Sequence, residues 1–422
     1  MTSYSLPYGS GSSIFVFEPQ ENPEIITPST TFSASDPLKV VRSSIENPIG
    51  LKDFPVLKNK TVAIAVNDKT RPVPHNHLLP PLLDKLDSMG VSKNNIRIII
   101  ASGTHTPMLP SEIERLLPPD IIANYTITAH DCDDKNNLVC LGNTSKNTPI
   151  WLNRDYANAD FKIVTGNIEP HHFMGFSGGV KSAAIGLTGR ETINTNHTFL
   201  LDDKSALGLY NENPMRQDVE EMGQKIGVDF ALNTILNEEK RIIYAISGAP
   251  LAVMKQGIQL SRQVCQVPVK KLYDLVIASV GGSPKDINLY QSQKALSRAS
   301  LLTKNGGVVI LVAECPEGSG SAGYEAFMQD IDTPQAVFKK FESVGFEVGP
   351  HKALQFAREL QRLKVILLSK MAPELVKELL LIPAVTPEEA LASARSLLPQ
   401  NPAIAILPYA KNILPTIQTI HR

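Results

Sequence analysis

Short apolar runs alternate with amphipathic segments along most of the chain from residue 61 onward. Runs at 62–66, 96–100 and 161–165 have the length and the Val/Ile content of buried strands. Segments 81–86 and 111–117 follow the first two runs and have the apolar spacing of helices. Strands without polar alternation, separated by helices, are typical of a parallel sheet covered on both faces. The pattern therefore predicts an α/β fold.

The second half of the chain repeats this pattern and predicts a second α/β domain. Its strand candidates lie at 274–280, 307–312, 364–368 and 403–407, with a helix expected at about 291–302. We predict an N-terminal α/β domain at 1–268, a smaller C-terminal α/β domain at 269–400, and a return of residues 401–422 to the first domain. Each domain is expected to contain a mainly parallel sheet flanked by helices.

Length and composition narrow the classes of function. A chain of 422 residues is long enough for two hydrophobic cores. Its 41 Lys and Arg nearly balance its 42 Asp and Glu, which does not favour binding to nucleic acid or to an anionic membrane. The four cysteines form no C-x-x-C pair, and no apolar stretch approaches the length of a membrane span. Residues 1–13 have neither the basic start nor the apolar core of a signal peptide. We therefore predict a soluble, cytoplasmic protein with no nucleic-acid or membrane partner.

Polar residues directly follow the first two predicted strands. The segment 67–72 reads Asn-Asp-Lys-Thr-Arg-Pro, and the next strand is followed by a Ser-Gly-Thr-His segment that ends at His105. Parallel strands place such residues at one edge of the sheet. Arg71 can hold a carboxylate through two hydrogen bonds, and His105 can act as an acid or a base near neutral pH. A simple turn capped by Asp68 and a structural role for the histidine stay open as alternatives.

A longer polar segment, 166–181, follows the third predicted strand. It reads Gly-Asn-Ile-Glu-Pro-His-His-Phe-Met-Gly-Phe-Ser-Gly-Gly-Val-Lys. Its glycines are expected to present backbone amides to a phosphate, with the amine of Lys181 beside them. Neighbouring side chains diverge in extended or helical backbone, so we expect at most one of His171 and His172 to enter a site. A glycine-rich linker with incidental histidines is the alternative.

A fourth segment, Tyr-Gln-Ser-Gln-Lys-Ala at 290–295, opens the first helix expected in the second domain. Gln291 and Lys294 are three residues apart and therefore share one helical face. They can supply a hydrogen bond and a positive charge to an acid. A solvated helix face is the alternative.

In combination, the four segments resemble the lactate racemase family, whose enzymes depend on a nickel-pincer nucleotide. The resemblance covers about residues 61–314 and rests on D-x-T-R-P, G-T-H, E-P-H-x-x-x-G-F-S-G-G-x-K followed by N-H, and Y-Q-x-x-K. It implies that His105 and His171 are the catalytic acid/base groups, that His197 is the nickel ligand, and that Lys181 can tether the cofactor. The implied cofactor contacts are Asp68, Lys69, Thr70, Arg71, Lys181 and His197, and the implied substrate contacts are Arg71, Gln291 and Lys294.

The resemblance implies an isomerase that racemises or epimerises a small 2-hydroxy acid by reversible hydride transfer to the cofactor. It also implies an active site in a cleft between the two domains, and separate enzymes that synthesise the nucleotide. Two other functions are compatible with the same residues: a metal-dependent hydrolase that uses the histidines, and a non-enzymatic protein that binds a nucleotide or an organic acid. The sequence identifies neither the particular 2-hydroxy acid nor the oligomeric state.

Overall fold

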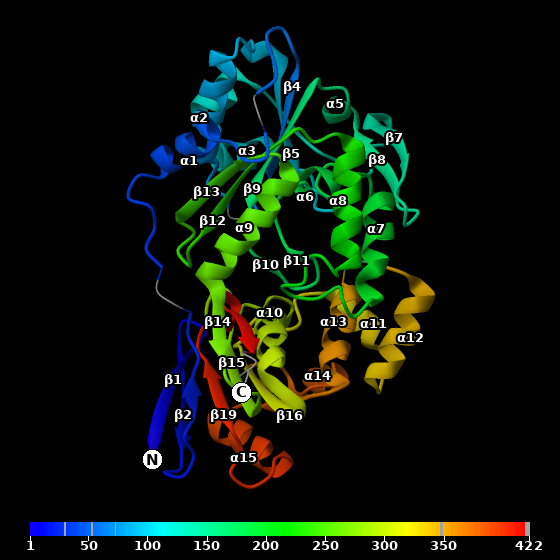
Figure 1. Cartoon of the computed structure of the whole chain (residues 1–422). Helices are drawn as coiled ribbons and strands as arrows, with labels where there is room; N and C mark the ends of the chain where they lie inside the picture. Colours follow the sequence, from blue (N-terminus) through cyan, green and yellow to red (C-terminus); the bar gives the residue numbers. More distant parts are fainter. Residues whose placement is uncertain (29–30, 52–53, 72, 347–348, 418–422) are drawn as a thin grey trace. The chain divides into compact units, whose positions relative to one another are not determined.

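The computed structural model describes residues 1–28, 31–51, 54–71, 73–346 and 349–417. The chain divides into two compact units (Figure 1). A central unit comprises Thr30–Val264, and a terminal unit joins Met1–Ser29 to Cys265–Arg422. The expectation of a cleft between two domains concerns the placement of these units and stays a prediction.

The boundary between the two units at residue 265 lies close to the predicted domain boundary at 268–269. Both chain ends, however, belong to the terminal unit and not to the predicted N-terminal domain. β3 (Glu24–Ile25) pairs with β19 (Ile404–Leu407), and β20 (Leu414–Ile417) pairs with β14 (Gln266–Val269). The first strands therefore leave the predicted 1–268 domain, and the described part of 401–422 does not return to it. These pairings join segments far apart in sequence, so the local hydrophobic pattern could not reveal them.

The central unit is built on a six-stranded sheet in the order β13-β12-β9-β4-β5-β6. The strands are β4 (Val62–Asn67), β5 (Ile96–Ala101), β6 (Thr126–Ala129), β9 (Phe161–Asn167), β12 (Phe230–Leu236) and β13 (Ile242–Gly248). Only β13 runs antiparallel to its neighbour. The strands predicted from the first three apolar runs are thus confirmed as β4, β5 and β9.

Helices cover this sheet on both faces, which explains its uninterrupted apolar strands. Val62, Ile64 and Val66 of β4 belong to one core with Leu78 and Leu82 of the neighbouring helix α2. The alternate β4 residues are alanines on the opposite face, where the short helix α6 contacts the strand. The helices of this part of the chain are α1 (Pro37–Glu46), α2 (His75–Ser88), α3 (Pro110–Leu116), α4 (Pro119–Asn124), α5 (Arg154–Ala157), α6 (Lys181–Ala184), α7 (Arg190–Thr198), α8 (Pro214–Ile226) and α9 (Pro250–Cys265).

The terminal unit contains a second six-stranded sheet, in the order β18-β17-β16-β15-β19-β3, and all of its pairings are parallel. Its remaining strands are β15 (Tyr273–Ser279), β16 (Thr303–Val312), β17 (Lys364–Leu368) and β18 (Ile382–Ala384). Its helices are α10 (Leu289–Ala299), α11 (Ala322–Met328), α12 (Pro334–Val344), α13 (Pro350–Leu360), α14 (Pro373–Glu378) and α15 (Pro387–Leu397). The predicted fold class, two α/β domains with mainly parallel sheets, is confirmed.

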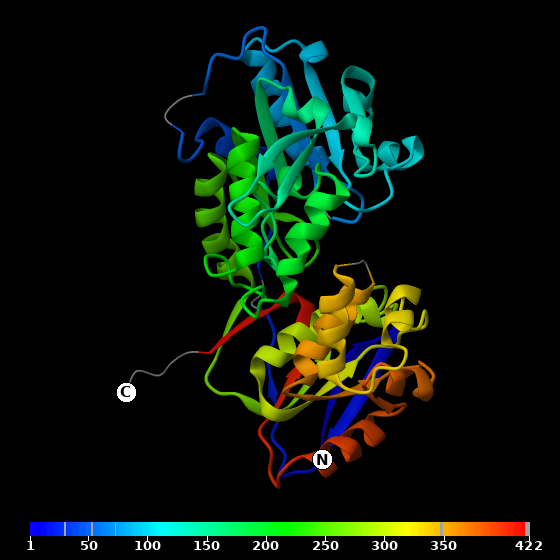
Figure 2. The same ribbon diagram turned by 90° about the vertical axis from the view of Figure 1, so that its right-hand side faces the viewer.

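The N-terminal hairpin of β1 (Thr2–Tyr8) and β2 (Gly11–Phe17) completes the core of the terminal unit (Figures 1 and 2). Leu6, Phe15 and Phe17 are fully buried in one cluster with strand residues such as Ile277 and Ile310. Helix α15 packs beside the hairpin in the same cluster. Among the helices that the structure describes, none has the length and apolarity needed to cross a lipid bilayer.

Candidate active site

The carboxyl ends of β4 and β5 bring together a carboxylate and an imidazole. Because these parallel strands are neighbours in the sheet, the loops that follow them meet. The Nδ1 atom of His105 lies 2.7 Å from Oδ2 of Asp68. Asp68 is 3% exposed, whereas the side chain of His105 is 45% exposed. A buried acceptor thus orients an accessible imidazole, and with its proton on Nδ1 the ring presents the lone pair of Nε2.

Thr70 and Arg71, which lie on the same loop as Asp68, extend the hydrogen bonding around this pair. The Oγ1 hydroxyl of Thr70 donates to Asp68 at 2.6 Å and accepts from Nη1 of Arg71 at 3.0 Å. Burial opposes ionisation of Asp68, but the hydrogen bonds from His105 and Thr70 outweigh it and hold the pKa of this carboxyl below its ordinary value. Asp68 is therefore ionised near neutral pH and stabilises a positive charge on the imidazole.

The structure separates Lys69 from this group. Its amine forms an ion pair with Glu112 of α3 instead. The last residue of the D-x-T-R-P motif, Pro72, lies outside the described residues. Of the predicted 68–71 cofactor segment, Asp68, Thr70 and Arg71 thus gather around His105, while Lys69 is directed to α3.

His171 and His172 lie in a small hairpin after β9, where β10 (Pro170–His171) pairs with β11 (Gly175–Phe176). The expectation that these two side chains diverge is wrong, because their rings stack with centroids 4.5 Å apart. The chain turns sharply between the two short strands, so the alternation of an extended backbone does not apply there. The backbone N–H of Met174 donates to Nδ1 of His171 at 3.3 Å, which leaves the proton of a neutral ring on Nε2.

The glycines at 178 and 179 serve close packing more than the predicted phosphate cradle. Gly178 has a φ of 85°, and a Cβ there would lie 2.5 Å from a side-chain carbon of Ile168. The N–H of Gly179 donates to Oδ1 of Asn233 at 2.7 Å, and the N–H of Ser177 donates to the carbonyl of residue 169 at 2.9 Å. Two amides that were expected to face a ligand are therefore engaged within the protein.

A buried arginine that the sequence did not single out holds this glycine-rich loop. Arg216 of α8 is fully buried and donates to the carbonyls of Phe176 and Gly178, each at 3.1 Å. Its guanidinium also pairs with Glu220 at 2.6 Å. The only local signal is the four-residue spacing of Arg216 and Glu220, which is common on solvated helices. Burial, known only from the fold, distinguishes this pair.

Lys181 and His197 lie close enough for the charge of Lys181 to act on the imidazole of His197. The amine of Lys181 forms no hydrogen bond or ion pair with any residue that the structure describes. Its burial, and then the charges of Arg71 and Arg216, lower its pKa to about 7. A substantial fraction of the amine is therefore uncharged, and hence nucleophilic, near neutral pH.

His197 is held as a neutral, oriented imidazole. Its Nδ1–H donates to the carbonyl of Ile193 one helical turn earlier, at 2.8 Å, which places the ring lone pair on Nε2. Burial lowers the pKa of His197 to about 4, although the bond to Ile193 favours the charged form, and the charge of Lys181 lowers the pKa further. The ring of Phe173 lies 5.7 Å from the ring of His197 and 4.5 Å from that of His171. The structure thus brings His171 and His197 into one neighbourhood, with Phe173 between them.

Gln291 and Lys294 lie on α10 of the terminal unit and contact each other as their spacing predicts. Nζ of Lys294 donates to Oε1 of Gln291 at 2.7 Å. The hydroxyl of the preceding Tyr290 lies 3.3 Å from Nε2 of His351 on α13. The residues in contact with this motif therefore include His351 of α13, which the sequence analysis did not indicate.

A hydrolytic metal centre built from the predicted histidines finds no support in the described residues. Among them, one group of three possible ligands lies within 4.8 Å: Asp131, Cys132 and Asp133. No predicted site residue belongs to it, and Asp133 is already bound by Arg190 through two hydrogen bonds of 2.7 Å.

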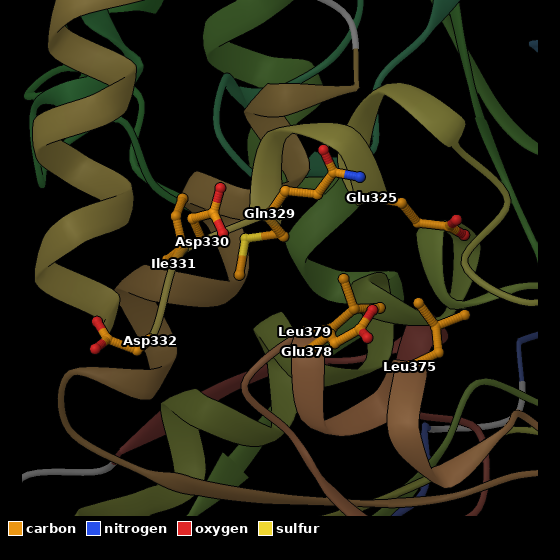
Figure 3. A pocket seen from close by; sticks show the side chains of 9 residues that line it. Glu325, Gln329, Asp330, Ile331, Asp332, Leu375, Glu378 and Leu379 are labelled. Carbon is orange, nitrogen blue, oxygen red and sulfur yellow. The ribbon is translucent and has the colours of Figure 1, made fainter.

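Two hollows of the surface lie apart from the predicted residues. One of about 740 Å³ (Figure 3) is lined by Glu325, Met328, Gln329, Asp330, Ile331, Asp332, Leu375, Glu378 and Leu379. Its four carboxylates disfavour a 2-hydroxy acid anion. The other, of about 560 Å³, is lined by Cys132, Asp133, Lys135, Leu138, Trp151, Gly189, Arg190, Glu191 and Asn194.

Comparison with known proteins places the chain in a family. Residues 8–208 match the lactate racemase N-terminal domain, and residues 269–414 match the lactate racemase C-terminal domain. The chain is 31% identical to a lactate racemase of Thermoanaerobacterium thermosaccharolyticum over 98% of this chain and 99% of that protein. It is also 31% identical to a lactate racemase of Lactiplantibacillus plantarum over 88% of this chain and 89% of that protein.

Solved structures agree with this placement. The structure of the lactate racemase apoprotein from T. thermosaccharolyticum superimposes with a TM-score of 0.90, at 29% identity, covering 99% of this chain and 100% of that one. A protein from Thermotoga maritima, at 18% identity and a TM-score of 0.64 over 90% of this chain and 97% of that one, shares the fold. The chain therefore belongs to the lactate racemase family and is an isomerase.

Proposed function

We propose that this protein racemises a small, lactate-like 2-hydroxy acid with the help of a nickel-pincer nucleotide. The observation that carries the proposal is the pair of Asp68 and His105, 2.7 Å apart, with Arg71 fixed on the same loop. An accessible imidazole backed by a buried carboxylate is suited to accept a hydroxyl proton. A guanidinium beside it is suited to bind the carboxylate of the same small acid.

The residues around His197 fit the proposed cofactor. A neutral imidazole with its lone pair on Nε2 is a ligand for a divalent metal, and its bond to Ile193 is the outer partner that orients such ligands. The amine of Lys181, whose pKa is lowered to about 7, is reactive enough that it would condense with a thiocarboxylic acid group of the cofactor, forming a thioamide and releasing water. When bound, the nickel-pincer nucleotide would accept hydride from the substrate carbon and return it.

The side chains then supply binding and proton transfer. Nε2 of His105 takes the hydroxyl proton of one enantiomer, and Asp68 stabilises the resulting imidazolium. We assign the same task for the other enantiomer to His171, since inversion needs a proton acceptor on each side of the carbon. The ring must first release the hydrogen bond that its Nδ1 accepts from the backbone N–H of Met174, which exposes a lone pair. Arg71 holds the carboxylate during the exchange, and Gln291 and Lys294 of the terminal unit bind the same substrate.

The test is racemisation of enantiopure 2-hydroxy acids by protein produced together with cofactor-synthesis enzymes. Chiral chromatography should show conversion of lactate or a close analogue to its mirror form. His105→Ala and His171→Ala should each abolish conversion while metal analysis shows the nickel retained. Lys60→Met, which removes the exposed ion pair with Asp160, is the control and should keep the wild-type rate. A loaded wild-type protein that converts none of a panel of short 2-hydroxy acids would refute the proposal.

A further inference from the structure

The terminal unit buries a lysine that the proposed chemistry does not use. Lys352 of α13 is 1% exposed. Its Nζ donates to Oε1 of Gln355 at 3.0 Å and to Oε1 of Gln293 at 3.4 Å. No carboxylate pairs with it among the residues that the structure describes. A buried lysine amine that is held only by amide oxygens is costly to protonate, which suggests a purpose beyond packing.

The surroundings of Lys352 belong to the helix that carries the proposed substrate contacts. Its Nζ lies 4.3 Å from the ring centroid of Tyr290, the first residue of the Y-Q-x-x-K motif. Next to it on α13, His351 contacts the hydroxyl of the same tyrosine at 3.3 Å. Together with the bond to Gln293 of α10, these contacts fix the first turns of α10 from one side.

The charge of Lys294 acts on Lys352. Burial lowers the pKa of Lys352 well below its ordinary value, and the charge of Lys294 lowers it further. The repulsion between two positive charges decreases when an anion binds beside them. A second unused donor lies at the same place, because Nε2 of Gln355 is buried and has no hydrogen-bond partner. The surroundings of Lys352 are thus suited to negative charge.

We propose that Lys352 is a positioning residue for the substrate carboxylate, holding Tyr290 and α10 in place and adding a second positive charge behind Lys294 when the carboxylate is bound. The proposal rests on the proposed function, because it takes Gln291 and Lys294 as substrate contacts. In this proposal α13 helps to bind the carboxylate of the substrate and takes no part in proton transfer.

The test compares cofactor-loaded Lys352→Met, which removes the charge at similar side-chain length, with the wild type. We expect KM for lactate to rise on the order of tenfold and kcat to stay within about twofold, because a charge that acts on binding alone changes KM. Lys340→Met is the matched control. The amine of Lys340 also lies over an aromatic ring, that of Phe327 at 5.1 Å, and donates to the carbonyl of Phe327 at 2.7 Å. This variant should keep the wild-type KM.

An uncharged analogue separates the effect of charge from a loss of packing. Inhibition by lactamide, which lacks the carboxylate, should be equal in the wild type and in Lys352→Met. An unchanged KM for lactate, or an equal loss of affinity for lactate and lactamide, would overturn the proposal. If Lys352→Met does not fold, Lys352→Gln removes the charge but keeps a hydrogen-bond donor near Gln293 and Gln355, and it should produce the same selective loss.

The two proposals fail in different ways. A loaded wild type that binds lactate but does not racemise it contradicts the proposed function. Calorimetric titration with lactate then still compares Lys352→Met with the wild type, and equal dissociation constants contradict the role of Lys352. An active wild type whose KM is insensitive to Lys352→Met contradicts the role of Lys352 alone.

Discussion

At the scale of single residues, the hydrogen bond between Asp68 and His105 is the feature on which the proposed proton transfer depends most. Asp68→Asn keeps the shape of the side chain but removes its charge and can favour the wrong tautomer of the imidazole. We expect kcat for racemisation to fall roughly 10²- to 10⁴-fold with little change in KM. Steady-state kinetics with chiral detection measure both constants. A kcat within about threefold of wild type would show that the carboxylate does not support the base.

A second residue-scale prediction concerns stability against acid. His75 is 2% exposed, donates from Nε2 to the carbonyl of Asn67, and has a pKa lowered to about 4 by burial. Between this value and the ordinary pKa of 6.5, the unfolded chain binds a proton at His75 that the folded chain does not. Stability therefore falls as the pH drops through this window, by roughly 2 kcal/mol between pH 7 and pH 5.

Replacing the imidazole of His75 tests whether this residue causes the loss of stability at low pH. His75→Gln keeps an N–H for the carbonyl of Asn67 and does not titrate, so the apoprotein should lose less stability on going from pH 7 to pH 5. Urea unfolding at both pH values measures the difference. His77→Gln, on the same helix, is the control and should follow the wild type. Equal pH dependence in His75→Gln and the wild type would contradict the prediction.

At the scale of elements, the loop between β11 and α6 depends on glycine for two separate reasons. Gly178 combines a φ of 85° with a Cβ position that would meet Ile168 at 2.5 Å and a carbonyl oxygen at 3.0 Å. Gly227, the C-cap of α8, has a φ of 72° and open space around its Cβ position. We expect Gly227→Ala to cost about 1 kcal/mol and Gly178→Ala about 2–4 kcal/mol.

The measurement is chemical unfolding of both variants, together with nickel content after loading. Gly178→Ala should also retain less nickel than Gly227→Ala, because the strained loop connects His171 to Lys181. Equal destabilisation by the two substitutions would show that the close approach to Ile168 is relieved at no cost.

At the scale of the whole molecule, the N-terminal hairpin of β1 and β2 stabilises the terminal unit, which also contains the last strands of the chain. Leu6 is fully buried in the core of the terminal unit, whereas Ile14 of the same hairpin is 54% exposed. Leu6→Ala should cost about 2–5 kcal/mol, and Ile14→Ala should stay within about 0.5 kcal/mol. Differential scanning calorimetry of the two variants checks the contrast. Equal, small effects would contradict the assignment of the hairpin to this core.

The sequence by itself determined the fold class and the place of the chemistry. Runs such as 62–66 and 96–100 are apolar because both faces of each strand are covered, and that requirement is visible locally. Polar segments directly after such runs must lie at the carboxyl edge of a parallel sheet, so Asp68 and His105 could be expected near each other. The combination of motifs further indicated the family, which the comparisons confirm.

The tertiary structure alone decided contacts between residues distant in sequence. Three such contacts join segments about 40 or more residues apart. They are the pairing of β3 with the terminal sheet, the hydrogen bonds of Arg216 to the glycine-rich loop, and the contact of Lys352 with Tyr290. The stacking of His171 on His172 is local, but it depends on a turn that the sequence did not predict. Burial and long-range pairing arise from the packing of the complete chain, so no local pattern of residues specifies them.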